Sequence, residues 1–163
     1  MNIIEVVKSA LLEFPKISAV CNDIHIDFTD DVPTNYGLSS TGDTLLKEDI
    51  LGGQIRQHNF ILYAVYQSVN DYDRMANSGV LLELHTWLEQ YAAEQKLVVT
   101  VNDVELAGAL SRITCANGMI YSIPNDNFND GIQYQLQISA EYKLESEDFH
   151  YGKNRKKMVG TLY

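Results

Sequence analysis

Residues 56–68 read RQHNFILYAVYQS, and this stretch decides the fold. Side chains alternate between the two faces of a β-strand, so from Phe60 onward both faces of this stretch are apolar. A strand that is apolar on both faces is typical of the interior of a sheet and is usually covered on both sides. We therefore expect residues 56–68 to form the central strand of the protein.

A long amphipathic helix is predicted between residues 71 and 95. Asn70 or Asp71 can cap its first free backbone amides. Gly79 weakens such a helix by about 1 kcal/mol relative to alanine, so it marks either a close approach or a break after the first turn. The apolar stripe that faces the sheet has members three or four residues apart: Leu81, Leu84, Leu88 and Tyr91.

The other elements predict an α+β fold with a mostly antiparallel sheet. Residues 3–14 have helical apolar spacing, and Pro15 ends that helix. Residues 24–28 alternate as a strand, and residues 132–144 alternate over a longer run that predicts a strand packed on one side. Asn117-Gly118 predicts a tight hairpin turn.

The segment from Thr29 to Asp49 is rich in turn-forming residues and is expected to be a long loop, with a short strand near residues 36–40 as one option. Gly52-Gly53 would then turn the chain into the central strand. Long loops in small domains more often serve function or an interface than not. This loop is therefore a candidate contact surface.

The chain has 163 residues, which suits one domain with a real core. We expect a single α+β domain over residues 1–144, in which the N-terminal helix and the long central helix flank the sheet. Residues 145–163 form a C-terminal extension that changes from acidic to basic to apolar. We expect this extension to be ordered by assembly contacts.

The formal net charge of −10 argues against a DNA-binding surface, which needs clustered lysine and arginine. Cys21 and Cys115 are predicted to be reduced thiols in apolar surroundings. The sequence has no basic, apolar leader and no stretch near the roughly 20 apolar residues that span a bilayer. A soluble protein made in a cytoplasm, with no membrane partner, is expected.

Motifs for catalysis or cofactor binding are missing from the sequence. The four histidines are isolated from one another and from cysteine, which disfavours a metal site. Residues 125–131 resemble a calcium loop, but Phe128 and Gln137 stand where oxygen ligands are needed. Serine, histidine and aspartate are all present, but a catalytic triad cannot be argued without geometry. We expect no enzyme activity and no cofactor.

Ten tyrosines against five phenylalanines indicate contact surfaces, because tyrosine is enriched at protein interfaces. Tyr36 lies in a predicted loop, and Tyr163 lies in the extension. At each of these positions an interface role and no interface role are equally expected. The basic run of the extension is predicted to dock on the acidic surface of a neighbouring copy, with Leu162 and Tyr163 as an apolar anchor. Its members are Lys153, Arg155, Lys156 and Lys157.

Several short motifs, together with the order of elements over about residues 3–144, carry a family resemblance. These are Gly37-Leu-Ser-Ser, Gly52-Gly-Gln-Ile-Arg56, Phe60-Ile-Leu-Tyr63, Asp71, Asn77 and the stretch from Leu81 to Leu88. The chain resembles the small tail-terminator, or minor capsid, proteins of tailed phages and prophages of Gram-positive bacteria. The motifs are diffuse and include no catalytic box.

The resemblance implies a structural virion protein, assembled in the bacterial cytoplasm, that forms a homohexameric ring on the head-proximal end of the tail. Implied partners are other copies of itself, the tail tube protein, the sheath protein in contractile tails, and the head–tail connector or stopper. DNA would pass through the lumen without specific binding. Carboxylates lining that lumen would repel its phosphates.

A ring requires a head-to-tail interface that closes by rotation. Arg56 and His58 are candidate contacts, because they lie where the central strand leaves the core. We expect Arg56 to pair with a carboxylate of the next subunit. Alternatives are another head–tail joining or stopper protein, a protein that binds DNA through its extension, and a small cytosolic enzyme or ligand-binding domain. The last would be favoured by a deep pocket with convergent polar groups.

Overall fold

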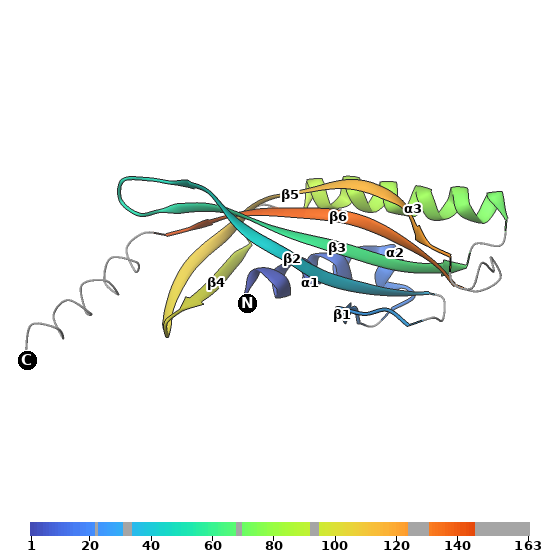
Figure 1. Cartoon of the computed structure of the whole chain (residues 1–163), viewed down its shortest axis with the longest axis horizontal. Coiled ribbons are helices and arrows are strands. Elements are labelled where there is room, and N and C mark those ends of the chain that lie inside the picture. Colours follow the sequence, from blue (N-terminus) through green and yellow to red (C-terminus); the bar gives the residue numbers. More distant parts are fainter. Residues whose placement is uncertain (22, 31–33, 68–69, 92–94, 124–130, 146–163) are drawn as a thin grey trace, which may run out of the picture.

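The computed structural model describes residues 1–21, 23–30, 34–67, 70–91, 95–123 and 131–145, and the fold is that of these residues (Figure 1). Three helices and six strands follow one another along the chain. They are α1 (Ile3–Glu13), α2 (Pro15–Ser18), β1 (His25–Ile26), β2 (Asn35–Glu48), β3 (Gln54–Gln67), α3 (Asp71–Gln90), β4 (Lys96–Val101), β5 (Val104–Ser122) and β6 (Gly131–Leu144).

The six strands form one mixed sheet in the order β1-β2-β3-β6-β5-β4. β1 pairs with β2 in parallel, and the other neighbours are antiparallel. β3 and β6 lie at the centre and pair along their whole length, from Gln54 opposite Leu144 to Gln67 opposite Gly131. The predicted α+β class and the central position of β3 are confirmed.

One face of this sheet carries the core. Leu62 lies opposite both Leu38 of β2 and Leu136 of β6, and all three are buried. The prediction for residues 132–144 is confirmed, because every second side chain from Ile132 to Leu144 is buried. These aligned rows make one continuous apolar surface across four strands, and burying it is the main favourable term in folding.

All three helices lie on that face. A Cβ added at Gly118 of β5 would make ordinary van der Waals contact with Leu136 of β6 and with Leu81 of α3. α3 therefore packs against the sheet here. α1 and α2 lie beside α3, where the rings of Phe14 and Trp87 are 5.9 Å apart between centroids. Lys16 of α2 also forms a 2.6 Å ion pair with a glutamate of α3. The protein is therefore a two-layer structure of helices on a sheet.

The face of β3 opposite the helices is only partly covered in the described residues, although a strand that is apolar on both faces is usually covered on both sides. Ile61 and Tyr63 on the opposite face are half-buried, and Tyr63 contacts the exposed ring of Tyr121. Val65 is buried, and Gln133 beside it donates a 2.8 Å hydrogen bond to Thr29, so the chain after β1 covers this end. The remainder of the face is mainly polar and open, with Met119 among its exposed side chains.

One turn prediction from local sequence is wrong, and one predicted strand is shorter than expected. Asn117-Gly118 is not a hairpin but a bulge inside β5, with Asn117 at a φ of 56° and a 3.0 Å hydrogen bond from its side chain to Gln137. Residues 24–28 form just the two-residue β1, because Asp27 has a φ of 66° and ends the strand. The bulge forms at Asn117-Gly118 because the long strand β6 pairs with β5 on both sides of it.

The expected loop from Thr29 to Asp49 contains the 14-residue strand β2, which is much longer than the short strand considered from the sequence. β2 and β3 form a long hairpin whose end stands beyond the helix layer (Figure 1). The turn at Gly52-Gly53 is confirmed, with Gly52 at a φ of 92°. Residues 102 and 103 form the turn between β4 and β5, both with positive φ.

α3 runs from Asp71 to Gln90 without a break, and the Asn70 side chain caps it by accepting from the Asp73 amide at 3.0 Å. Gly79 therefore does not split the helix. A Cβ added at Gly79 would have no atom within 4 Å apart from those of its own helix backbone. Gly37 differs, since an added Cβ would lie 2.1 Å from the carbonyl oxygen of Phe28.

Substituting these two glycines should change stability in opposite directions. We expect Gly37→Ala to lower the free energy of unfolding by about 1–3 kcal/mol, because rigid backbone must move. Gly79→Ala should raise it by about 1 kcal/mol, because alanine loses less entropy in a helix. Urea unfolding of both variants beside the parent chain measures the two effects. A neutral Gly37→Ala variant would contradict the packing of residues 27–30 over β2.

Candidate functional site

Asp43 is the centre of a polar network on the core-facing side of the sheet, past the end of the helix layer. Its carboxylate accepts hydrogen bonds from Arg56 Nε at 2.6 Å, from the Tyr142 hydroxyl at 2.6 Å and from His58 Nδ1 at 3.0 Å. Arg56 also donates to the side-chain oxygen of Gln54 at 3.0 Å. Asp43 and Arg56 are each about one-quarter exposed, so solvent screens the pair incompletely.

Strand register brings these groups together. Asp43 of β2 lies opposite His58 of β3, and Arg56 lies opposite Tyr142 of β6. Register shifts in β2 after Ser40 and after Leu45 bracket Asp43. Such bulges twist a strand and redirect its side chains. The network therefore joins three neighbouring strands at the base of the β2–β3 hairpin.

The network holds Asp43 as a carboxylate. Partial burial by itself would raise its pKa, but the hydrogen bonds from Tyr142, Arg56 and His58 outweigh it and place the pKa below its ordinary value. Burial raises the pKa of Tyr142, and the hydrogen bond to Asp43 raises it further, so its proton stays in place. Arg56 keeps its charge, because the attraction of Asp43 exceeds its desolvation.

A cleft of about 630 Å³ opens beside the network. One wall is polar and contains Asp43, Gln54, Arg56, His58 and Tyr142. The other wall is mainly apolar and comes from the start of α1, from β4 and from the ends of β5 and β6. Its members include Ile3, Ile4, Val98, Val101, Leu106 and Leu144. A cleft of this size with convergent polar groups on one wall is suited to binding.

Ser40, His58 and Asp43 are joined in the order found in serine hydrolases. The Ser40 hydroxyl lies 2.5 Å from His58 Nε2, while His58 Nδ1 faces the carboxylate of Asp43. In such an order the carboxylate orients the imidazole, which then takes the serine proton. Asp43 is shared with Arg56 and Tyr142, however, which spreads its charge over three donors. The same contacts also fix the base of the hairpin.

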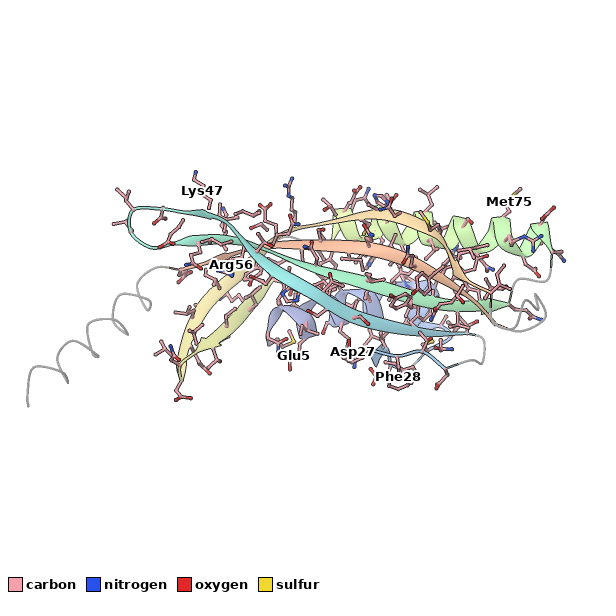
Figure 2. All side chains as sticks on the ribbon, viewed as in Figure 1. Glu5, Asp27, Phe28, Lys47, Arg56 and Met75 are labelled. Carbon is pink, nitrogen blue, oxygen red and sulfur yellow. The ribbon has the colours of Figure 1, made fainter. Side chains whose placement is uncertain are left out.

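Residues 45–53 form the end of the β2–β3 hairpin, and we call this segment the arm. Asp49 shapes its turn by accepting from the amides of Leu51 at 2.8 Å and Gly53 at 2.9 Å through one carboxylate oxygen. This turn presents Ile50, which is fully exposed, and Leu51, which is 67% exposed. Leu45 and Leu46 are also exposed. Figure 2 shows Lys47 on the arm and Arg56 at its base.

The structure places two of the predicted interface residues in contacts within the chain. Arg56 forms a 2.6 Å ion pair with Asp43 of its own chain, and its pairing with a carboxylate of the next subunit stays a prediction. Tyr36 is 1% exposed and hydrogen-bonded to Tyr66 at 2.9 Å, so it belongs to the core and not to a loop surface. Burial raises the pKa of Tyr36 to about 12. His58 lines the cleft, and its ring packs against the ring of Phe60.

The remaining predicted residues, Lys153, Arg155, Lys156, Lys157 and Tyr163, lie outside the described residues, as does the calcium-like loop. Sequence reasoning missed Ser40, Asp43 and Tyr142. The turn at Gly52-Gly53 could have indicated a hairpin that brings Asp43 near residues 58 and 59. Extending that hairpin outward without irregularities pairs Asp43 with Asn59, and only the register shift between Leu45 and Lys47 places it opposite His58.

Both cysteines are free and half-buried, in agreement with the predicted reduced thiols. Burial raises the pKa of Cys115 to about 12, which makes it a weak nucleophile at neutral pH. In the part of the chain that the structure describes, no three potential ligands gather as a metal site. None of the helices described is both long and apolar enough to cross a membrane.

Comparison of the chain with models of known protein families and with curated proteins finds no match to either.

Asp43→Asn should weaken the protein at neutral pH by about 2 kcal/mol, because a charge-assisted network loses its anion. The lowered pKa of Asp43 stabilises the fold above the unfolded pKa of about 4, and this stabilisation is lost as pH falls through the folded pKa. The difference in melting temperature between parent and variant should therefore shrink below about pH 4. Thermal unfolding from pH 7 to pH 2 measures it.

Asp103→Asn is the matched control. Asp103 is exposed in the β4–β5 turn, where asparagine also accepts a positive φ. Its difference from the parent should be small at every pH. A difference for Asp43→Asn that stays constant down to pH 2 would contradict the role of the carboxylate.

Proposed function

We propose that the protein is a structural virion protein with a tail-terminator-like fold, which forms a ring on the head-proximal end of a phage or phage-like tail tube. The observation that carries this proposal is the arm. It holds four exposed apolar side chains, two of them on a turn fixed by Asp49 and two on the adjoining end of β2, and it stands beyond the protein's own helix layer. Exposed apolar groups on a pre-organised projection favour contact with another protein.

A ring on a tube needs several distinct contact surfaces. Each subunit must meet two neighbours through complementary patches, and must also meet the tube below and the connector or stopper above. α3 runs toward the end of the molecule opposite the arm (Figure 1) and supplies further exposed apolar side chains, among them Tyr72, Met75 and Leu82. Met75 points away from the sheet (Figure 2). Two separate apolar surfaces suit an assembly better than a monomer.

The charge of the chain supports passage of DNA without binding. The net charge is −10, and the open sheet face offers amides and hydroxyls, among them Asn59, Gln137 and Ser139. Arg112 on that face is paired with Glu141 at 3.1 Å. Neutral and acidic groups repel or ignore phosphates, whereas binding needs unpaired lysine and arginine. Lysine and arginine at the pore wall of a solved ring would refute a DNA-repelling lumen.

The test is the mass of the full chain by light scattering at several concentrations, with and without purified tail tubes. We expect a hexamer, or a monomer that becomes a ring at tube ends. Leu51→Asp should abolish that assembly with the melting temperature nearly unchanged, because Leu51 is 67% exposed in the monomer. Charge on an apolar contact must be desolvated when the contact forms.

Val20→Asp is the matched control, since Val20 is 57% exposed but belongs to neither the arm nor the apolar surface of α3. It should leave the ring intact. A parent chain that remains monomeric and ignores tubes would refute the terminator proposal. Assembly that survives Leu51→Asp would refute the part assigned to the arm.

The hydrogen-bonded order of Ser40, His58 and Asp43 specifically favours a second candidate, an acyl-transfer enzyme with Ser40 as its nucleophile. In this hypothesis the Ser40 oxygen bonds to an acyl carbon while His58 accepts the hydroxyl proton. His58 then gives that proton to the leaving group as the bond between the leaving group and the acyl carbon breaks. This candidate ranks second because Asp43 is tied to Arg56 and Tyr142, and because the exposed arm has no place in it.

Incubation with a fluorophosphonate probe, followed by mass spectrometry, decides this second candidate. Modification of Ser40 that is lost in His58→Gln would support an activated serine. If the network is structural, as the terminator proposal requires, we expect no modification of the parent chain above that of the Ser40→Ala control.

A further inference from the structure

The cleft beside Asp43 lies where β6 ends and the C-terminal extension begins. Leu144, the last residue of β6, is itself one of the lining residues. The mainly apolar wall of the cleft includes Val101, which is 41% exposed in the described chain. The cleft of about 630 Å³ is mostly apolar and lies next to the start of the C-terminal extension, so the composition of the extension can be compared with that of the cleft.

The extension has the complementary composition. Residues 158–163 read MVGTLY and supply four apolar side chains, and residues 153–157 read KNRKK. The whole chain carries −10, and residues 146–163 contribute two acidic and four basic side chains, so residues 1–145 carry −12. A basic, apolar-ended segment is therefore attracted to the body of this protein by charge and can bury its end in the cleft.

The length of the extension lets it reach the body of a neighbouring copy. The amide of Glu145 still donates to the carbonyl oxygen of Ala107 at 2.9 Å, so pairing with β5 continues to residue 145 and the extension starts from the end of the sheet. The next residues include Glu147 and Asp148, which the acidic body repels. Extended at about 3.3 Å per residue, residues 146–157 reach about 40 Å, enough to span to an adjacent subunit.

We propose that residues 153–163 of one copy bind in the cleft of the next copy, with the apolar end against β4 and the start of α1. This inference rests on the proposed ring and names one of its subunit contacts. Such a contact is head-to-tail, because segment and cleft are different surfaces, and it can close into a ring. It also gives the cleft an occupant that requires no catalysis.

Disulfide trapping in the full chain tests the contact. Leu162→Cys is combined with Val101→Cys, and equal amounts of isotopically labelled and unlabelled protein are mixed, oxidised gently and digested. We expect the linked peptides to include pairs with one labelled and one unlabelled half. Interference from the native thiols is small, because burial raises the pKa of both Cys21 and Cys115.

The matched control combines Leu162→Cys with Val20→Cys, since Val20 is 57% exposed but does not line the cleft. It should give far fewer linked peptides. Links within single copies, or no excess over the control, would overturn the proposal. Light scattering on the same samples separates the two ideas: a ring without the link refutes this contact alone, whereas a monomer refutes the ring as well.

Discussion

The fold depends on one constraint, the burial of a single continuous apolar face. Every second side chain of β6 from Ile132 to Leu144 is buried, and β3 aligns its own buried row opposite it. A sheet with one such face must be covered on that side alone, because its other face is satisfied by water. The three helices lie there for this reason, and the opposite face keeps its amides and hydroxyls.

The mismatch in length between sheet and helices creates the candidate site. A strand of 14 residues extends about 46 Å, whereas the 20 residues of α3 extend about 30 Å, and α1 is shorter. The helices therefore leave part of the core-facing side uncovered. There the buried row changes from apolar residues to Asp43, Arg56, His58 and Tyr142, whose polar groups satisfy one another. The cleft, the network and the arm all arise where the helix layer ends.

Local signals failed where a long neighbouring strand was present. Asn117-Gly118 prefers a two-residue turn in isolation, but β6 offers a continuous partner on both sides and converts it to a bulge. Residues 35–48 contain many turn-forming residues, yet β3 supplies backbone hydrogen bonds along the whole segment. Backbone groups of a sheet must be paired, and this requirement outweighs weak local preferences.

The sequence by itself determined the α+β class, the central strand, the cap and stripe of α3, and the one-sided β6. Each of these follows from periodicity or a cap within a short window, where cause and effect are local. Tertiary structure alone decided which side of the sheet the helices cover, the length of β2, the burial of Tyr36 and the partner of Arg56. Asp43 and Tyr142 are 99 residues apart in sequence and 2.6 Å apart in space. A contact of that kind depends on strand order and register, which no local pattern specifies.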